Sequence, residues 1–227
     1  MEVFLDIGFT LMGGPKDSPP KMIRHVLNLE DDCSEVLYDI VFCENHQTSD
    51  SLVNSLEKAF GLRINSDQRR EIANFWQMQY VSAYELEGAS AFIKNLARSG
   101  LGLHIVSNLW LPFYQKFKIV FREIFNMLSS ETLSFEEGIR KPSLEIYRRA
   151  SDRSGALLAE SVMVGDSVGN DIIPCAELGM KCIWFKSRPM EKHQLDSKRY
   201  LISRYIDIYE ANSLGEAQAI IERILLK

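Results

Sequence analysis

The chain has 227 residues, of which 46% are hydrophobic and 25% are charged, and its formal net charge at pH 7 is −5. This length and composition predict a globular protein with a substantial core, built as one large domain or as one domain with an inserted lobe. The acidic balance argues against nucleic acid as a partner, although it leaves room for a local basic pocket that binds a small anion.

The sequence indicates neither membrane insertion nor secretion. No run approaches the roughly 18 apolar residues of a membrane-spanning helix, and the first residues lack the charged and apolar regions of a signal peptide. The cysteines show no metal-ligand spacing; they are Cys33, Cys43, Cys175 and Cys182. We therefore expect a cytoplasmic protein with reduced thiols and no membrane partner. The oligomeric state stays open.

The first predicted element is a short buried strand over residues 3–5 that ends at Asp6. A carboxylate at the carboxyl end of such a strand occupies the place where open α/β sheets bind ligands. Two residues later, where a second carboxylate would complete an acid/base pair with Asp6, the sequence has Gly8. The chemistry of this site therefore depends on what Asp6 can do without that partner.

Residues 14–87 follow a helical pattern. Pro15, Pro19 and Pro20 are expected to break the chain after the first strand. Apolar side chains at helical spacing and turn residues between them then predict helices over 32–43, 52–60 and 66–80. We interpret this stretch as a small helical lobe without strands.

From Gly88 onward, predicted helices and strands alternate. The expected strands lie at 101–106, 127–129, 161–166 and 181–185, and the expected helices at 91–100, 112–121, 143–153, 171–178 and from 213 onward. This alternation is typical of βαβ units and a parallel sheet. We predict an α/β fold: a doubly wound, Rossmann-like core domain formed by 1–13 and 88–227, with an inserted helical domain at 14–87.

Polar residues at separate strand ends could build one site. Besides Asp6, they are Ser107 with Asn108, and Asp166; Lys141 stands just before a predicted helix. In a parallel sheet such residues converge at one edge. Two carboxylates with phosphate oxygens suit Mg²⁺, while a hydroxyl and an ammonium group suit a phosphoryl oxygen. Each residue alone is equally compatible with a turn, a cap or a solvated surface.

Together these residues resemble the motifs of the haloacid-dehalogenase-like (HAD) superfamily. Its first motif is D-x-D-x-T, whose positions are held here by Asp6, Gly8 and Thr10. Ser107 matches the serine of the second motif, Lys141 the lysine of the third, and "GDSVGND", with Asp166 and Asp171, the acidic fourth. The segments "EGASAFIKNLARSGLGLHIVSN" and "IRKPSLEIYRRA" also resemble its core, and the helical lobe resembles its C1-type cap.

The resemblance implies an aspartyl-phosphate mechanism that requires Mg²⁺, and a mobile cap that selects a small phosphorylated substrate. It implies a role for each matching residue. The catalytic residues are Asp6, Ser107 and Lys141; the substrate-binding residues are Thr10, Ser107, Asn108 and Lys141; the metal ligands are Asp6, the main-chain carbonyl of Gly8, Asp166 and Asp171. Because Gly8 keeps its carbonyl, the implied metal site survives the substitution.

The acid/base role of the second aspartate does not survive. A positioned acid/base typically contributes about 10²–10⁴-fold, so three functions stay open. The first is a slow or atypical Mg²⁺-dependent phosphohydrolase. The second is cleavage of a carbon–heteroatom bond, as in phosphonatases, where Lys21 or Lys58 would have to form a Schiff base, or in dehalogenases, which generally lack the Gly165–Asp166 pair. The third is a catalytically degenerate protein that binds a phospho-ligand or a protein.

Trp110 directly follows the Ser107 loop and has two interpretations. It lines the site, or it packs beneath the cap.

Overall fold

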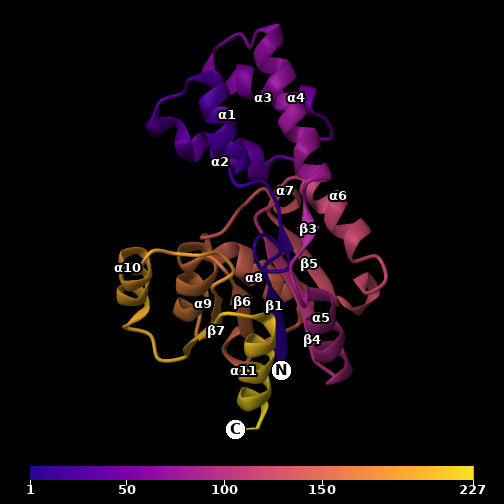
Figure 1. Ribbon diagram of the computed structural model, residues 1–227, viewed down its shortest axis with the longest axis vertical. Coiled ribbons are helices and arrows are strands. Elements are labelled where there is room, and N and C mark those ends of the chain that lie inside the picture. The colour runs from indigo at the N-terminus through magenta and orange to yellow at the C-terminus, as the bar shows by residue number, and fades with distance from the viewer. Residues whose placement is uncertain (227) are drawn as a thin grey trace.

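Within residues 1–226, which the computed structural model describes, a six-stranded parallel sheet forms the centre of the larger part of the molecule (Figure 1). Its strands are β1 (Glu2–Leu5), β4 (Gly102–Ser107), β5 (Ser130–Leu133), β6 (Val162–Gly165), β7 (Lys181–Phe185) and β8 (Ile208–Ala211). They follow the order β5-β4-β1-β6-β7-β8, and every neighbouring pair is parallel. The predicted doubly wound α/β fold is confirmed.

The strand order reverses at β1, which lies between β4 and β6. Leu5 pairs with Ile105 on one side and with Val164 on the other. The carboxyl ends of these three strands therefore open at one edge of the sheet, at the switch point where open α/β sheets bind ligands.

Helices cover both faces of the sheet because β1 is apolar on both. Val3 and Leu5 join the larger of two apolar clusters, while Phe4 joins the smaller. The larger cluster includes side chains of α5 (Ala89–Arg98), α6 (Leu111–Val120) and α11 (Leu214–Leu225). The smaller includes those of α8 (Leu144–Ser154), α9 (Ile173–Glu177) and α10 (Lys192–Ile202). The short helix α7 (Ser134–Glu137) follows β5.

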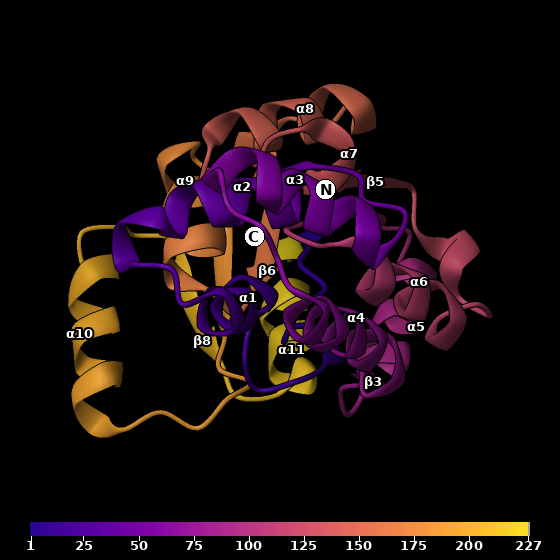
Figure 2. The ribbon, with the colours of Figure 1, turned by 90° about the horizontal axis from the view of Figure 1, so that it is seen from above.

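A second group of helices stands over the carboxyl edge of the sheet, away from both termini (Figures 1 and 2). They are α1 (Pro19–Leu27), α2 (Ser34–Cys43), α3 (Ser49–Phe60) and α4 (Ser66–Val81). Thr48 and Asn65 cap the starts of α3 and α4, and Gly61 ends α3 in the left-handed conformation. Apolar side chains of these helices belong to the same cluster as Val3 and Leu5 of β1.

A small antiparallel pair, β2 (Met12–Gly13) and β3 (Tyr84–Glu85), lies where the chain enters and leaves this helical group. The expectation of a lobe without strands is therefore wrong at its end. A Cβ atom on Gly13 would lie 2.4 Å from the end of the exposed Tyr84 ring, which would have to turn away. The prolines were also misread: Pro19 and Pro20 begin α1, because proline is tolerated in the first turn of a helix.

Two further expectations differ from the structure. The strand expected at 127–129 lies at Ser130–Leu133, after a 3₁₀ turn over Phe125–Met127. The sequence reading missed α10, which buries only Ile202 and so carries a weak apolar pattern, together with β8 after it. Among the described helices, none combines the length and apolar character needed to cross a membrane.

Candidate active site

The structure brings Asp6, Ser107 and Lys141 together at the switch point. The Oδ1 atom of Asp6 accepts hydrogen bonds from Ser107 Oγ at 2.8 Å and from Lys141 Nζ at 2.6 Å. Ser107 ends β4, beside β1, so strand pairing itself places the hydroxyl next to Asp6. All three side chains are buried, and a carboxylate held in this way has a fixed orientation.

Lys141 is buried almost completely, and its ammonium group is satisfied on all sides. Besides Asp6, Nζ donates to Asp171 Oδ1 at 2.6 Å and to the Val106 carbonyl at 3.0 Å. Burial alone would lower the pKa of Lys141, but the two carboxylates raise it well above its ordinary value. Lys141 therefore stays charged.

Asn108 fixes the backbone of Lys141. Its Oδ1 accepts from the Lys141 N–H at 2.8 Å, and its Nδ2 donates to the Lys141 carbonyl at 2.9 Å. The sequence reading assigned Asn108 to substrate binding. The structure places it beside the cavity with both side-chain atoms already bonded to the Lys141 loop.

Asp166 and Asp171 complete a cluster of carboxylates with Asp6, in which the nearest oxygens of the three lie within 4.8 Å of one another. Burial and the neighbouring carboxylates raise the pKa of Asp166 to about 7. Burial, with the charge of Asp6, likewise raises the pKa of Asp171, although Lys141 opposes the shift. Three acidic groups this close are electrostatically costly, and a divalent cation among them would relieve that cost.

The donor set fits Mg²⁺, which favours oxygen ligands. Asp6, Asp166 and Asp171 line the cavity over this cluster, as does Gly8, the residue expected to contribute its carbonyl. Gly165 makes room for the arrangement, because a Cβ atom there would lie 2.5 Å from the Asp171 side chain. The Ser167 N–H then holds Asp171 Oδ2 at 2.8 Å.

Gly8 leaves an open position at the mouth of this cluster. A Cβ atom built on it meets no other described atom within 4 Å, and its φ lies outside the left-handed region. The following turn is tight, with Phe9 at φ 56° and its N–H bonded to the Met12 carbonyl at 2.6 Å. A side chain could therefore stand at position 8 without strain.

Thr10 and Ser107, both expected to bind substrate, are fully buried and do not line the cavity. Thr10 Oγ1 lies 3.3 Å from Asp6 Oδ2, and Ser107 Oγ also accepts from the Ile7 N–H at 3.3 Å. Both hydroxyls therefore contact the Asp6 carboxylate from the protein interior and not from the cavity.

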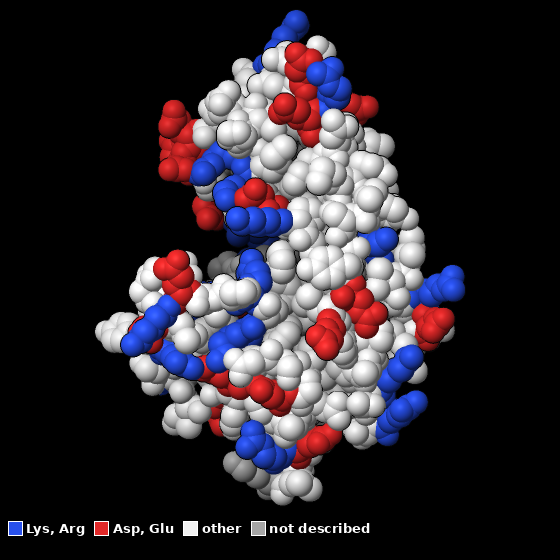
Figure 3. Space-filling view, in the orientation of Figure 1, with Lys and Arg blue, Asp and Glu red and all other residues white. Residues whose placement is uncertain are grey.

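A cavity of about 770 Å³ opens over Asp6, between the sheet edge and the helices α1, α2 and α4. Figure 3 shows a hollow between the two parts of the molecule, with Lys and Arg side chains at its borders. The basic residues that line the cavity are Lys16, Lys21, Arg140, Lys141 and Arg188. Five acidic residues line it as well, Asp6, Asp17, Glu35, Asp166 and Asp171, so the cavity offers an anionic ligand individual basic side chains and no net excess of positive charge.

Arg140 and Arg188 were missed by the sequence reading. Arg188 Nη2 donates to Asp166 Oδ2 at 2.6 Å, and its guanidinium lies 4.2 Å from the Phe9 ring centre. Arg140, next to Lys141, reaches α2 and bonds both Glu35 and Asp39. Only the adjacency of Arg140 to Lys141 was visible in the sequence. Arg188 lies in a loop after β7, where nothing in the pattern marks it.

A family model described as HAD-hydrolase-like matches residues 138–208, which include Lys141, Asp166 and Asp171. The fold agrees over nearly the whole chain with a HAD-family hydrolase from Deinococcus radiodurans R1, solved with bound phosphate and sodium. The match covers 99% of this chain and 96% of the Deinococcus chain, with a TM-score of 0.62 and 17% sequence identity. Residues 138–208 thus match the HAD-hydrolase-like family model, and the chain as a whole has the fold of HAD-family hydrolases.

Other proteins are similar to this chain in structure or in part of their sequence. A putative HAD hydrolase from Bacillus subtilis, solved with magnesium, has a TM-score of 0.56 and 20% identity over 97% of both chains. A glyceraldehyde 3-phosphate phosphatase from Pyrococcus furiosus is 29% identical over 116 residues, which are 51% of this HAD-like chain and 48% of that protein. A phosphoserine phosphatase from Thermus thermophilus is 31% identical over 96 residues, 42% and 38% respectively. The chain thus spans about half or less of these curated relatives.

Proposed function

We propose that this HAD-like chain is a Mg²⁺-dependent phosphohydrolase that acts on a small phosphorylated metabolite through an aspartyl-phosphate at Asp6. The observation that carries the proposal is the Asp6 carboxylate, held by Ser107 and Lys141 at 2.8 and 2.6 Å beside two further carboxylates. The partly matching relatives named as phosphatases of small metabolites support the substrate class.

In the proposed first step, an Asp6 oxygen attacks phosphorus and the bond to the ester oxygen breaks, which leaves an acyl phosphate on Asp6. Lys141 stays charged and offsets negative charge on the phosphoryl group and the carboxylates. Mg²⁺, held by Asp6, Asp166 and the Gly8 carbonyl, with Asp171 as a further ligand, would neutralise phosphoryl oxygens. Asn108, Thr10 and Ser107 keep Lys141 and Asp6 in place.

Both steps lack an acid/base at position 8. The leaving alkoxide must take its proton from solvent or from the cap, and the water that hydrolyses the acyl phosphate has no positioned base. We therefore expect slow turnover of alkyl esters and faster turnover of aryl or acyl phosphates, whose leaving groups need no acid.

We further propose that residues 14–87 act as the cap that selects the substrate. The cavity over Asp6 is lined from this side by Lys16, Ser18, Glu35, Tyr38 and Gln79. Side chains from the cap therefore surround the part of a substrate that lies beyond its phosphoryl group.

A second candidate is cleavage of a carbon–phosphorus bond. The position of Lys21 favours this reaction, because Lys21 lines the cavity and Lys58 does not. The ammonium group of Lys21 is exposed and pairs with Asp17 at 2.7 Å. If Lys21 forms a Schiff base with phosphonoacetaldehyde, borohydride will trap the adduct on Lys21 in the wild type and not in Lys21→Met.

The test of the main proposal is phosphate release from alkyl, aryl and acyl phosphates, with Mg²⁺ and with a chelator. We expect release that depends on Mg²⁺ and is lost in Asp6→Asn. Asp152→Asn, the same change at an exposed residue of α8, is the matched control and should leave the rate unchanged. Release that persists in Asp6→Asn or with the chelator would refute the proposal.

A further inference from the structure

Two buried N–H donors in the structure lack a hydrogen-bond partner among residues 1–226. They are Nε2 of Gln79 and Nε1 of Trp110, and both residues are only 3% exposed. The indole of Trp184 shows the ordinary case, because its Nε1 donates to the Asp166 carbonyl at 3.1 Å. A donor buried without a partner is destabilising, so its retention requires an explanation.

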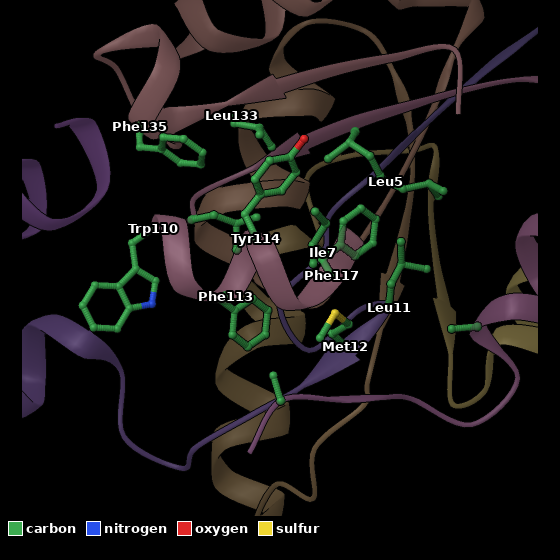
Figure 4. Close-up of a cluster of buried hydrophobic side chains, with 14 of the residues drawn as sticks. Leu5, Ile7, Leu11, Met12, Trp110, Phe113, Tyr114, Phe117, Leu133 and Phe135 are labelled. Atoms are coloured by element: carbon green, nitrogen blue, oxygen red, sulfur yellow. The ribbon is translucent and has the colours of Figure 1, made fainter. Parts of the chain in front are cut away.

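Both residues line the cavity over Asp6. Gln79 lies on α4, and Trp110 directly precedes α6, which packs against α4. The Trp110 ring stands at the edge of the aromatic cluster drawn in Figure 4 and packs against Trp76, with ring centres 5.0 Å apart. Phe75, one turn before Gln79, lies 6.0 Å from the same ring. Gln79 and Trp110 thus belong to neighbouring walls of one cavity.

Apolar side chains also line this cavity. Phe42, Leu109 and Phe113 line the same cavity, and Gly14 gives the Phe113 ring room, since a Cβ atom there would lie 2.7 Å from it. Each donor atom is itself buried, so its side chain must turn toward the cavity before water or a ligand reaches the N–H. A ligand that displaces water from such a donor without offering an acceptor loses affinity, whereas one that offers an acceptor gains the hydrogen bond.

The chemistry of the two donors specifies the ligand atom. An indole N–H can only donate, so Trp110 requires an acceptor. The Gln79 amide can turn to present its N–H to a ligand acceptor as well. Lys16 and Arg140, which also line the cavity, favour an oxygen with partial or full negative charge.

We propose that Gln79 and Trp110 form a subsite for the leaving-group end of the substrate, and that this end carries a hydroxyl, carbonyl or carboxylate oxygen. The inference rests on the proposed function, because that function places the phosphoryl group at Asp6. It adds a substrate class: phosphate esters whose organic part ends in a hydrogen-bond acceptor rather than in an alkyl group.

Binding of non-hydrolysable phosphonates tests the subsite without turnover. The probes are alkylphosphonates of three to six carbons and their ω-hydroxy counterparts, titrated with Mg²⁺ present. We expect the hydroxy compound of the fitting length to bind about tenfold more tightly than the alkyl compound. It should also shift the Trp110 indole N–H signal in an NMR spectrum of ¹⁵N-labelled protein, assigned with Trp110→Phe.

Trp110→Phe and Gln79→Leu should each remove most of this preference and leave alkylphosphonate affinity unchanged. Gln79→Leu should also leave the melting temperature equal or higher, because an unpaired buried donor is replaced by an apolar group; a purely structural role of Gln79 would predict a loss. Gln77→Leu, an exposed residue of the same helix, and Trp76→Phe are the matched controls and should keep the preference.

Equal binding of both probe series at every length, with an unshifted Trp110 signal, would overturn the subsite. The two proposals fail separately. Discrimination among phosphonates without Mg²⁺-dependent hydrolysis of any phosphate ester would leave the subsite and refute the phosphohydrolase. Mg²⁺-dependent hydrolysis of esters without discrimination among phosphonates would support the phosphohydrolase and refute the subsite.

Discussion

At Asp6, one carboxylate oxygen already holds two donors, Ser107 and Lys141, before any ligand binds. These hydrogen bonds need no reorganisation when a substrate binds, because strand pairing and the Asn108–Lys141 contacts already fix the groups. Under the proposed mechanism, the residue that would transfer protons is missing at position 8. The chemistry of this site is therefore set as much by Gly8 as by Asp6.

Substitution of Gly8 by Asp should restore the missing acid/base. Its Cβ position is open and its backbone conformation suits any residue, so the variant should fold. We expect kcat for an alkyl phosphate to rise at least tenfold, within the roughly 10²–10⁴-fold that a positioned acid/base provides. Steady-state phosphate release measures it.

Gly8→Asn is the matched control, because it fills the same space without a titratable group. It should not raise kcat. A folded Gly8→Asp variant with wild-type kcat would show that proton transfer at this position does not limit turnover.

The elements that carry the site were largely predictable, while its borders were not. Asp6, Ser107 and Asp166 follow short apolar runs, and parallel strands necessarily bring such ends together. Arg188 and Gln79 reach the same cavity from a loop and from a helix whose position depends on packing between distant elements. No local pattern encodes that packing, so periodicity could not reveal them.

The contact between α2 and the sheet domain rests in part on one side chain. Arg140 Nε donates to Asp39 Oδ1 at 2.8 Å, Nη2 bonds Glu35, and the guanidinium lies 5.3 Å from the Tyr38 ring centre. In Arg140→Gln, we expect amide hydrogens of residues 34–43 to exchange about two- to fivefold faster, the range of exposed ion pairs.

Hydrogen exchange followed by mass spectrometry measures this change. Arg148→Gln, on the exposed face of α8, should leave exchange in 34–43 unaltered. Unchanged exchange in Arg140→Gln would mean that apolar packing alone holds α2 in place.

At the scale of the whole molecule, we expect the carboxylate cluster to link stability to pH and to Mg²⁺. Burial raises the pKa of Asp166 from 3.8 to about 7. Between these values the native state binds more protons than the unfolded state, so the free energy of unfolding without metal falls as pH rises. Mg²⁺ needs the ionised carboxylates, and its stabilising effect should therefore be larger at pH 8 than at pH 5.

Thermal unfolding measures this linkage. Mg²⁺ at about one hundred times its Kd should add about 2.7 kcal/mol, a rise in Tm of about 5–10 °C for a chain of this size. Asp166→Asn should lose most of the Mg²⁺ effect and only part of the pH dependence between 4 and 7, because the pKa of Asp171 stays raised by burial. The cluster would not be the metal site if the variant kept the full Mg²⁺ effect.

The measurement that tests the central claim most directly is mass spectrometry of the protein quenched in acid during turnover of an aryl phosphate with Mg²⁺. The account predicts one phosphoryl group on Asp6, which accumulates in the wild type because no base activates the hydrolytic water, and which is depleted in Gly8→Asp. Phosphate release with no covalent phosphoryl group on the protein, or with the group on another residue, would contradict it.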